Sequence, residues 1–231
     1  MRVGTFIKLP VTLVKSFFLL FLIYLPGSWG NWARYQYYKR KFKSCGKNVT
    51  IDAGVIINGA EHITVGDNVH IDKYCIIHAG KADIGKIKRK QNTAYQYDEG
   101  ELIIGSNIHV VQFCIIMAYG GVRIGDNCTL SAGTKIYSLS NLPYDPENRS
   151  KIVSIMPYTQ APFIMSPVCL EKNVWIGLDC IVMPGVHIEN DSFVASKSLV
   201  MGTFPTNSYI AGHPAKRVRK RFLTTDAQDC G

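Results

Sequence analysis

The sequence predicts an all-β solenoid, a parallel β-helix whose coils are assembled from repeated six-residue units. An aliphatic residue returns at every sixth position through residues 174–200, and the run closes with the motif IAGHPAK. The members of this series are Ile176, Val182, Ile188, Val194 and Val200. A period of six fits neither the 3.6-residue period of an amphipathic helix nor the alternation of a strand. It is typical of β-helices, in which each repeat forms one flat face of a coil.

Three upstream series have the same spacing and extend the predicted β-helix over most of the chain. They are Val65, Ile71 and Ile77; Ile104, Val110 and Ile116; and Ile124, Leu130 and Ile136. Four of the seven cysteines, Cys75, Cys114, Cys128 and Cys180, each lie four positions after an aliphatic member. The repeat takes a second small inward-facing residue there, so we expect core thiols rather than disulfides or metal ligands. An odd cysteine total without a CxxC pair also indicates a reducing compartment.

Residues 1–45 lack the repeat and predict a membrane-associating helical segment. Residues 16–26 read SFFLLFLIYLP, while residues 1–43 contain eight Lys or Arg and no Asp or Glu. The apolar stretch is about half of the roughly 20 residues needed to span a bilayer. Trp29, Trp32 and the basic YQYYKRKFK favour a helix in the interface of an anionic membrane. A helix packed across the end of the solenoid is the alternative; a full transmembrane span or a cleaved secretory signal is less favoured.

The predicted solenoid covers residues 46–221 and is interrupted twice. Residues 86–100 are polar, reading KIKRKQNTAYQYDEG, and residues 138–167 contain SLSNLPYDPENR. Long insertions in a compact fold are usually functional or disordered, and a solenoid places its chemistry there because its wall is uniform. Residues 222–231 are expected to form a flexible, partly helical tail.

The last coils carry a recognisable signature. The stretch NVWIGLDCIVMPGVHIENDSFVASKSLV, followed by SYIAGHPAK, resembles the C-terminal signature of hexapeptide-repeat acyltransferases. The N-terminal LPGSWGNWARYQYYKRKF resembles the membrane-associated branch of that family, which acetylates bacterial surface polysaccharides. The resemblance implies a left-handed β-helix that assembles as a homotrimer. It also implies acetyl-CoA as co-substrate, bound in the groove between two subunits.

The resemblance assigns cofactor contacts to six positions. They are Gly177, Leu178, Ser196, Gly202, Lys216 and Arg219. The two basic residues suit the phosphates of CoA, which Arg and Lys bind well. A solvated basic tail and ordinary small coil residues are the competing interpretations. The chain also departs from the family, with ASKS in place of GAGS and Met201–Gly202 where a Lys often stands.

The family's catalytic histidine has no counterpart here. The position of this general base, near the start of the long insertion, is occupied by Asn141, or by Ser140 after a shift of one residue. An Asn amide can orient a hydroxyl but does not accept a proton near neutral pH. General-base assistance is commonly worth about 10²–10⁴-fold.

Three substitutes for the missing base can be named. His78 lies at a coil corner, where a surface or stacking role is the plainer interpretation. Asp145 and Glu147 lie in the second insertion, and the acceptor or a neighbouring chain could also supply the base. We do not favour His62, His70 or His109 as the base, because they follow positions of the repeat. We expect His187 and His213 to be structural or next to the cofactor.

The sequence therefore predicts an acetyl-CoA-dependent O-acetyltransferase that acts on a saccharide or lipid-linked saccharide in surface polysaccharide biosynthesis. It would work at the cytoplasmic face of the bacterial inner membrane. A catalytically impaired β-helix that binds or scaffolds partners is the alternative. Nucleic-acid binding is disfavoured despite the net charge of +9, because the N-terminal basic residues alternate with apolar ones. No metal is expected, because a zinc site of the carbonic-anhydrase type needs clustered histidines and no closely spaced pair is visible.

Overall fold

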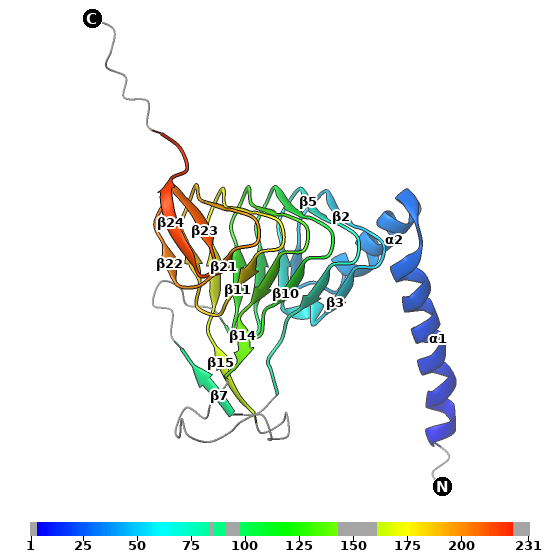
Figure 1. Cartoon of the computed structure of the whole chain (residues 1–231). Coiled ribbons are helices and arrows are strands. Elements are labelled where there is room, and N and C mark those ends of the chain that lie inside the picture. The colour runs from blue at the N-terminus through cyan, green and yellow to red at the C-terminus, as the bar shows by residue number, and fades with distance from the viewer. Residues whose placement is uncertain (1–3, 84–85, 91–97, 143–160, 224–231) are drawn as a thin grey trace, which may run out of the picture.

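The chain folds as a left-handed parallel β-helix preceded by two helices (Figure 1). The computed structural model describes residues 4–83, 86–90, 98–142 and 161–223, with side chains from residue 13 onward. The predicted fold class is confirmed. After the last strand, β24 (Ala215–Lys220), the described residues contain no helix. Most of the expected helical tail, residues 222–231, lies outside the described part of the chain.

Three sheets form the sides of the β-helix, because most coils contribute one short strand to each. Sheet A contains β1 (Ser44–Cys45), β4 (Ile63–Val65), β8 (Leu102–Ile104), β11 (Val122–Ile124), β16 (Val168–Leu170), β19 (His187–Ile188) and β22 (Thr203–Phe204). Sheet B contains β2 (Val49–Ile51), β5 (Val69–Ile71), β9 (Ile108–Val110), β12 (Thr129–Leu130), β17 (Trp175–Ile176), β20 (Phe193–Val194), β23 (Ser208–Gly212) and, antiparallel at its end, β24. Sheet C contains β3 (Ile56–Asn58), β6 (Ile76–His78), β10 (Ile115–Met117), β13 (Lys135–Tyr137), β18 (Ile181–Val182) and β21 (Leu199–Val200). A short 3-10 helix, η1 (Ala60–His62), joins β3 to β4.

The aliphatic residues of the six-residue series fill the inside of the β-helix. Each member predicted from the sequence is at most 2% exposed. Burial of a Val, Leu or Ile side chain contributes about 1.5–3 kcal/mol relative to leaving it in water. The four cysteines of the pattern are equally buried and unpaired, which confirms their core role. Burial raises the pKa of the Cys128 thiol to about 12, so this inward group stays protonated.

An asparagine ladder holds the corner between sheets A and B. Asn48, Asn68, Asn107 and Asn127 occupy the same corner position in successive coils, each with a left-handed backbone (φ 56–60°). Each side-chain amide donates to the carbonyl oxygen of the next amide, at 2.9–3.0 Å. Asn tolerates the left-handed conformation better than most residues because its short polar side chain bonds locally. The ladder therefore provides hydrogen bonds for the side-chain amides at this turn and helps to fix the stacking of the coils.

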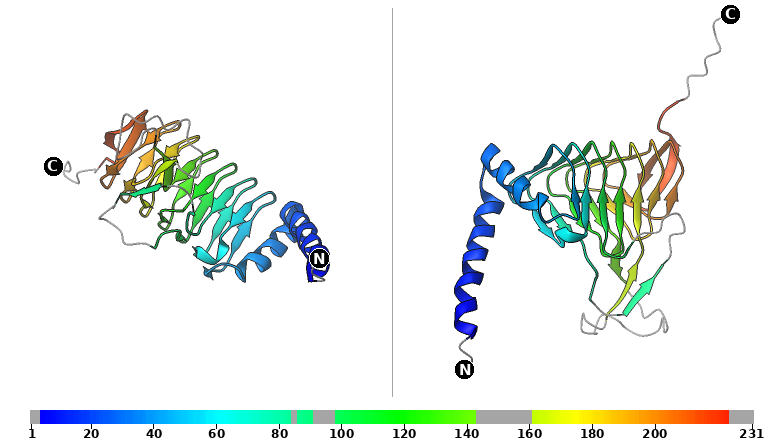
Figure 2. Two further views of the ribbon diagram at one scale, coloured as in Figure 1. Left: turned by 90° about the horizontal axis from the view of Figure 1, so that it is seen from below. Right: turned by 180° about the vertical axis from the view of Figure 1, so that it is seen from behind.

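Both insertions leave the β-helix at the corner between sheets C and A and combine into one arm. The arm contains β7 (Lys86–Arg89), β14 (Leu139–Asn141) and β15 (Pro162–Met165), with β15 antiparallel to β14 and parallel to β7. It projects from the side of the coils (Figures 1 and 2). A small apolar cluster of Leu139, Ala161, Phe163 and Met165 stabilises it.

The N-terminal helices are joined to the first coil by a buried arginine. Helix α1 (Gly4–Tyr24) stands away from the coils, and α2 (Gly27–Lys39) packs on β2 (Figure 2). Arg34 of α2 is 0% exposed and donates to the carbonyl oxygens of Leu22 at 3.0 Å, Leu25 at 2.7 Å and Ile51 at 2.7 Å. Burial lowers the pKa of this guanidinium, and the Asp52 carboxylate opposes the shift. One side chain thus links the end of α1, the first turns of α2 and the first coil.

Replacing this arginine should detach the helices from the coils. In Arg34→Met, three buried carbonyl oxygens lose their donor, each at a cost of about 1–3 kcal/mol. We expect a loss of at least about 3 kcal/mol in unfolding free energy in urea, together with faster proteolysis within residues 24–45. Arg40→Met, which changes an exposed residue at the end of the same helix, is the matched control. Equal stability of the two variants would contradict this role.

Candidate functional site

The three residues predicted for catalysis lie at the corner between sheets C and A, where the arm begins. His78 is the last residue of β6, and the coil register aligns it with Met117 and Tyr137 in the next two strands. Ser140 and Asn141 belong to β14, which starts two residues after Tyr137. The fold therefore brings residues more than 60 positions apart in sequence to one corner.

His78 lies between the outer surface of sheet C and the arm. The Nδ2 atom of Asn58 is 3.2 Å from its Nε2, and the Tyr119 hydroxyl is 3.5 Å from its Nδ1. Tyr119 in turn packs against the apolar cluster of the arm. Both ring nitrogens of His78 thus have polar neighbours, and the ring is only partly exposed.

Ser140 and Asn141 are exposed to different degrees on β14. Ser140 pairs with Ile164 of β15 and is half-buried, whereas Asn141 pairs with Phe163 and is exposed. Their catalytic role stays a prediction. Asp145 and Glu147, the other bases considered, lie outside the described residues.

Three of the predicted cofactor residues meet at the corner between sheets B and C. The backbone N–H of Leu178 donates to the Ser196 hydroxyl at 3.1 Å, and the Leu178 side chain is 52% exposed. A Cβ on Gly177 would lie 2.6 Å from the backbone N of Ser196, so only glycine fits there. The N–H of Gly177 donates to the Val194 carbonyl oxygen at 2.8 Å, so the backbone of this corner is tied to the next coil while the Leu178 side chain faces outward.

The other three predicted cofactor residues lie elsewhere. Gly202 is at the opposite edge of sheet C, in a left-handed conformation (φ +88°) with open space around it. Lys216 and Arg219 lie on β24, which closes the end of sheet B, and both are exposed. The Arg219 guanidinium stacks 4.2 Å above the Tyr209 ring. The predicted set is therefore divided among one corner, the far edge of sheet C and the terminal hairpin.

A row of aromatic and imidazole side chains on the outside of sheet B was missed by the sequence analysis. Trp175 contacts Phe193 at 5.9 Å between ring centroids, and Phe193 contacts Tyr209 at 5.2 Å. In the earlier coils the same row is occupied by His70 and His109. A signal was available, because each of these residues directly precedes an inward aliphatic residue of the repeat.

A pocket of about 270 Å³ at an early corner between sheets B and C was also missed. Its lining consists of Asp52, Asp72, Lys73, Tyr74, Gln112 and Phe113. The rings of Tyr74 and Phe113 stack 5.7 Å apart and 7° from parallel, although both residues have left-handed backbones (φ 61° and 63°). Coils on either side have Gly54 and Gly133 at this corner. A bulky residue costs about 1–2 kcal/mol there, so the exposed aromatic pair suggests a surface for a ligand.

Comparison with known proteins identifies the family. The family model described as hexapeptide repeat of succinyl-transferase matches residues 112–138 and 167–196. The dTDP-4-amino-4,6-dideoxy-D-glucose acyltransferase of Escherichia coli is 30% identical over 180 residues, which cover 78% of this chain and 83% of that protein. The chain belongs to the hexapeptide-repeat acyltransferases. The family resemblance seen in the sequence, and the expectation of an acyltransferase, are thereby confirmed.

Two further proteins are similar to this chain. WbbJ of Escherichia coli K12, named as a lipopolysaccharide biosynthesis O-acetyl transferase, is 42% identical over 55 residues, 24% of this chain and 28% of WbbJ. A variant of AntD, an N-acyltransferase from Bacillus cereus solved with dTDP and coenzyme A, has a TM-score of 0.63 at 24% identity. The match covers 81% of this chain and 88% of AntD, and it shows that the two proteins share the fold.

Proposed function

We propose that this protein transfers an acyl group from acyl-CoA, with acetyl-CoA as the expected donor, to a sugar. The observation that carries the proposal is the likeness to the Escherichia coli dTDP-amino-sugar acyltransferase over most of both chains. The AntD structure with coenzyme A supports a CoA thioester as the donor. The meeting of Gly177, Leu178 and Ser196 at one corner supports it as well, because the family resemblance assigns donor contacts to all three.

An amino group on a nucleotide-linked sugar is the acceptor that best fits the corner between sheets C and A, where the residues predicted for catalysis lie. A hydroxyl must lose its proton during attack, whereas an amine attacks once it is in the neutral form. An amine with a pKa near 8, like an α-amino group, is partly neutral at physiological pH. Replacement of the family's histidine by Asn141 therefore slows acyl transfer to such an amine less than acyl transfer to a hydroxyl.

The O-acetyltransferase predicted from the sequence is the second candidate. Its acceptor would be a hydroxyl of a saccharide or lipid-linked saccharide in surface polysaccharide biosynthesis. The likeness to WbbJ and the apolar N-terminal helix favour it. In this case His78, whose ring nitrogens lie near Asn58 and Tyr119, is the base that we propose.

A thiol-release assay separates the two candidates. Purified protein with acetyl-CoA should release free CoA when given a dTDP-linked amino sugar, and little with the matching 4-hydroxy sugar. Asn141→His should raise kcat for the hydroxyl acceptor, towards the 10²–10⁴-fold expected of a general base, and change the amine reaction little. The second candidate would be favoured if the wild type used only hydroxyl acceptors and if His78→Gln abolished that activity.

The same assay examines the donor site. Lys216→Ala/Arg219→Ala should raise the KM for acetyl-CoA by about 10²–10⁴-fold, because two bonds to charged groups are lost and each contributes about 1.5–3 kcal/mol. Lys47→Ala, at the opposite end of the β-helix, is the control. An unchanged KM in the double variant would remove these two residues from the donor site.

We also propose that the chain forms a homotrimer through the outside of sheet C. Five aliphatic side chains and one lysine lie in register along this sheet: Ile56, Ile76, Ile115, Lys135, Ile181 and Leu199. They are half-buried or exposed in the single chain. The row is apolar except at Lys135, whose ammonium donates to the Gly133 carbonyl oxygen at 2.9 Å. Exposed aliphatic side chains in such a row favour an interface, and a closed symmetric assembly would cover them in each subunit.

A carboxylate in place of one of the aliphatic residues of this row should break the assembly, because it would be buried in the interface without a partner. Light scattering should give about three times the 25.8 kDa chain mass for the wild type and a lower mass for Ile115→Glu. Ile103→Glu, which changes an outward isoleucine of sheet A, is the matched control and should leave the mass unchanged. The same mass for all three proteins would contradict an interface on sheet C.

We propose, finally, that α1 binds the interface of an anionic membrane, at the cytoplasmic face predicted from the sequence. Among the described helices, none is long and apolar enough to cross a membrane. The exposed fractions of Phe17 and Phe21 are 69% and 64%, and Trp29 of α2 is 77% exposed. Amphipathic aromatics beside basic residues such as Lys39 and Lys41 suit such an interface.

Vesicle flotation examines this proposal. The protein should float with vesicles containing anionic lipid and less with purely zwitterionic ones. Phe17→Ala/Phe21→Ala should weaken binding by about a hundredfold, because each buried Phe contributes about 1.5–3 kcal/mol. Phe222→Ala/Leu223→Ala removes two exposed apolar residues at the other end of the β-helix and should bind as the wild type does. Flotation unaffected by the α1 variant would overturn the assignment.

A further inference from the structure

The coil register places two histidines side by side on the outside of sheet B. His70 of β5 pairs with His109 of β9, and their rings stack with centroids 5.3 Å apart and planes 19° from parallel. The two residues are 39 positions apart, with the first insertion between them. A search for closely spaced histidines in the sequence could not find this pair, so the sequence argument against a metal site does not apply to it.

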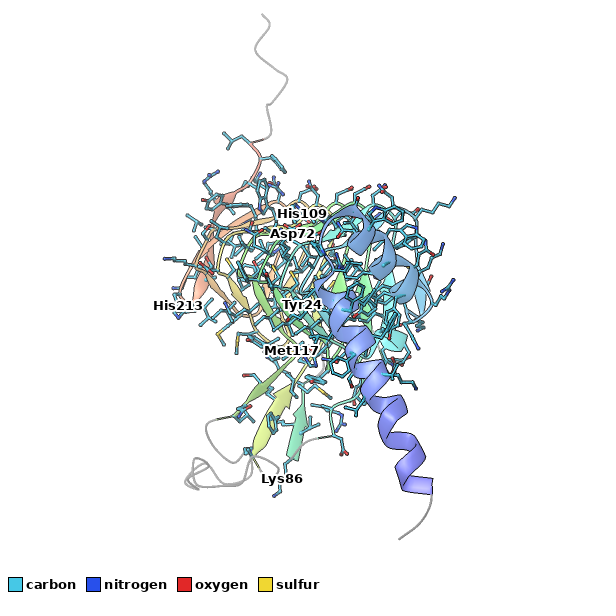
Figure 3. All side chains as sticks on the ribbon, turned by 90° about the vertical axis from the view of Figure 1, so that its right-hand side faces the viewer. Tyr24, Asp72, Lys86, His109, Met117 and His213 are labelled. Carbon is cyan, nitrogen blue, oxygen red and sulfur yellow. The ribbon has the colours of Figure 1, made fainter. Side chains whose placement is uncertain are left out.

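Both imidazoles point a nitrogen at the same carboxylate. Nε2 of His70 is 3.2 Å from Oδ1 of Asp72, and Nε2 of His109 is 3.1 Å from Oδ2. Asp72 and His109 lie together at one edge of the coils (Figure 3). One ligand atom from each of the three residues lies within 4.8 Å of the others. Ligand bonds of about 2.0–2.1 Å separate neighbouring donors by about 2.9–3.4 Å, so the two nitrogen–oxygen distances suit adjacent ligands of one ion.

A second aspartate completes the cluster and is held in place from α2. Oδ2 of Asp52 lies 3.5 Å from His70 Nε2, and its Oδ1 accepts a hydrogen bond from Asn31 at 2.8 Å. The Asn31 side chain in turn accepts from the buried Arg34. Carboxylate oxygens oriented by neighbouring side chains are typical of metal sites.

The cluster is open to solvent on one side. The two imidazoles are each 47% exposed, whereas Asp52 and Asp72 are 18% and 16% exposed. Both aspartates also line the pocket beside the Tyr74–Phe113 pair. An ion bound here would keep coordination positions for water or for an oxygen of a ligand in that pocket.

We propose that His70, Asp72 and His109 bind a divalent first-row transition-metal ion such as Zn²⁺, with Asp52 or water completing the coordination. Two imidazoles and a carboxylate suit such ions better than Mg²⁺ or Ca²⁺, which prefer oxygen alone. The ion would join the coil that carries His70 and Asp72 to the next coil, which carries His109 and follows the first insertion in sequence. This site is independent of the proposed acyl transfer.

Metal titration of the tag-free, full-length protein after EDTA treatment tests the site. Co²⁺ should give visible d–d absorption that saturates at one ion per chain, and Zn²⁺ should displace it. The Tm should rise with free Zn²⁺, because an ion bound only to the folded state stabilises it by mass action. Mg²⁺ should produce neither effect.

Variants assign the ligands. His70→Gln and His109→Gln should each weaken Zn²⁺ binding by more than 100-fold, exceeding the 10–100-fold cost of changes outside the ligand set. His62→Gln is the matched control, because its side chain is also 47% exposed and its nearest carboxylate, on Glu61, is 3.9 Å away. It should bind as the wild type does.

The wild type alone provides a second measurement, so the test does not depend on the folding of variants. Diethyl pyrocarbonate modification mapped by mass spectrometry should show Zn²⁺ protecting His70 and His109 but not His62. Absence of saturable Zn²⁺ binding, equal affinity in the histidine variants, or equal protection of all three residues would overturn the proposal.

Discussion

The parallel register between successive coils is the constraint on which the rest of this structure depends. Each strand pairs with the equivalent strand of the next coil, so one side chain lies above another at fixed positions around the helix. Inside, this stacks the aliphatic residues; at one corner, it stacks the asparagine amides. Because both insertions leave the helix at the corner between sheets C and A, the coils before and after them remain in register. On the outside, the register aligns side chains of successive coils, as it does for His70 and His109.

The buried guanidinium of Arg34 connects the N-terminal helices to this framework. It has backbone carbonyls as partners at the end of α1 and on β2, and the Asn31 amide relays its contact to Asp52. Asp52 lines the early pocket and faces His70. The proposed membrane-binding segment, the pocket and the proposed metal cluster therefore share one hydrogen-bonded chain.

At the corner between sheets C and A, the predicted catalytic residues constrain the acceptor that we propose. Loss of a general base corresponds to about 3–5 kcal/mol of barrier. Asn141 can still position an acceptor, and proximity to the thioester supplies a large part of such a reaction. An acceptor that is already a nucleophile requires little more, which is why an amine suits this corner. A hydroxyl acceptor would need the imidazole of His78, which the fold places beside the base of the arm.

The sequence alone determined the β-helix, because the six-residue period is a local pattern that each coil repeats. It also determined the inward cysteines and the family, whose signature is contiguous in the last coils. It located the residues at the turns, among them Gly177, Leu178 and Ser196, but not their mutual contacts. Only the tertiary structure decided that His78 lies at the foot of the arm, that Arg219 stacks on Tyr209 and that His70 meets His109. The reason is physical: the neighbours of His78 and the meeting of the two histidines are set by how many residues leave the coil at each insertion, and no local period records that number. The contact of Arg219 is set by the antiparallel return of β24 along β23.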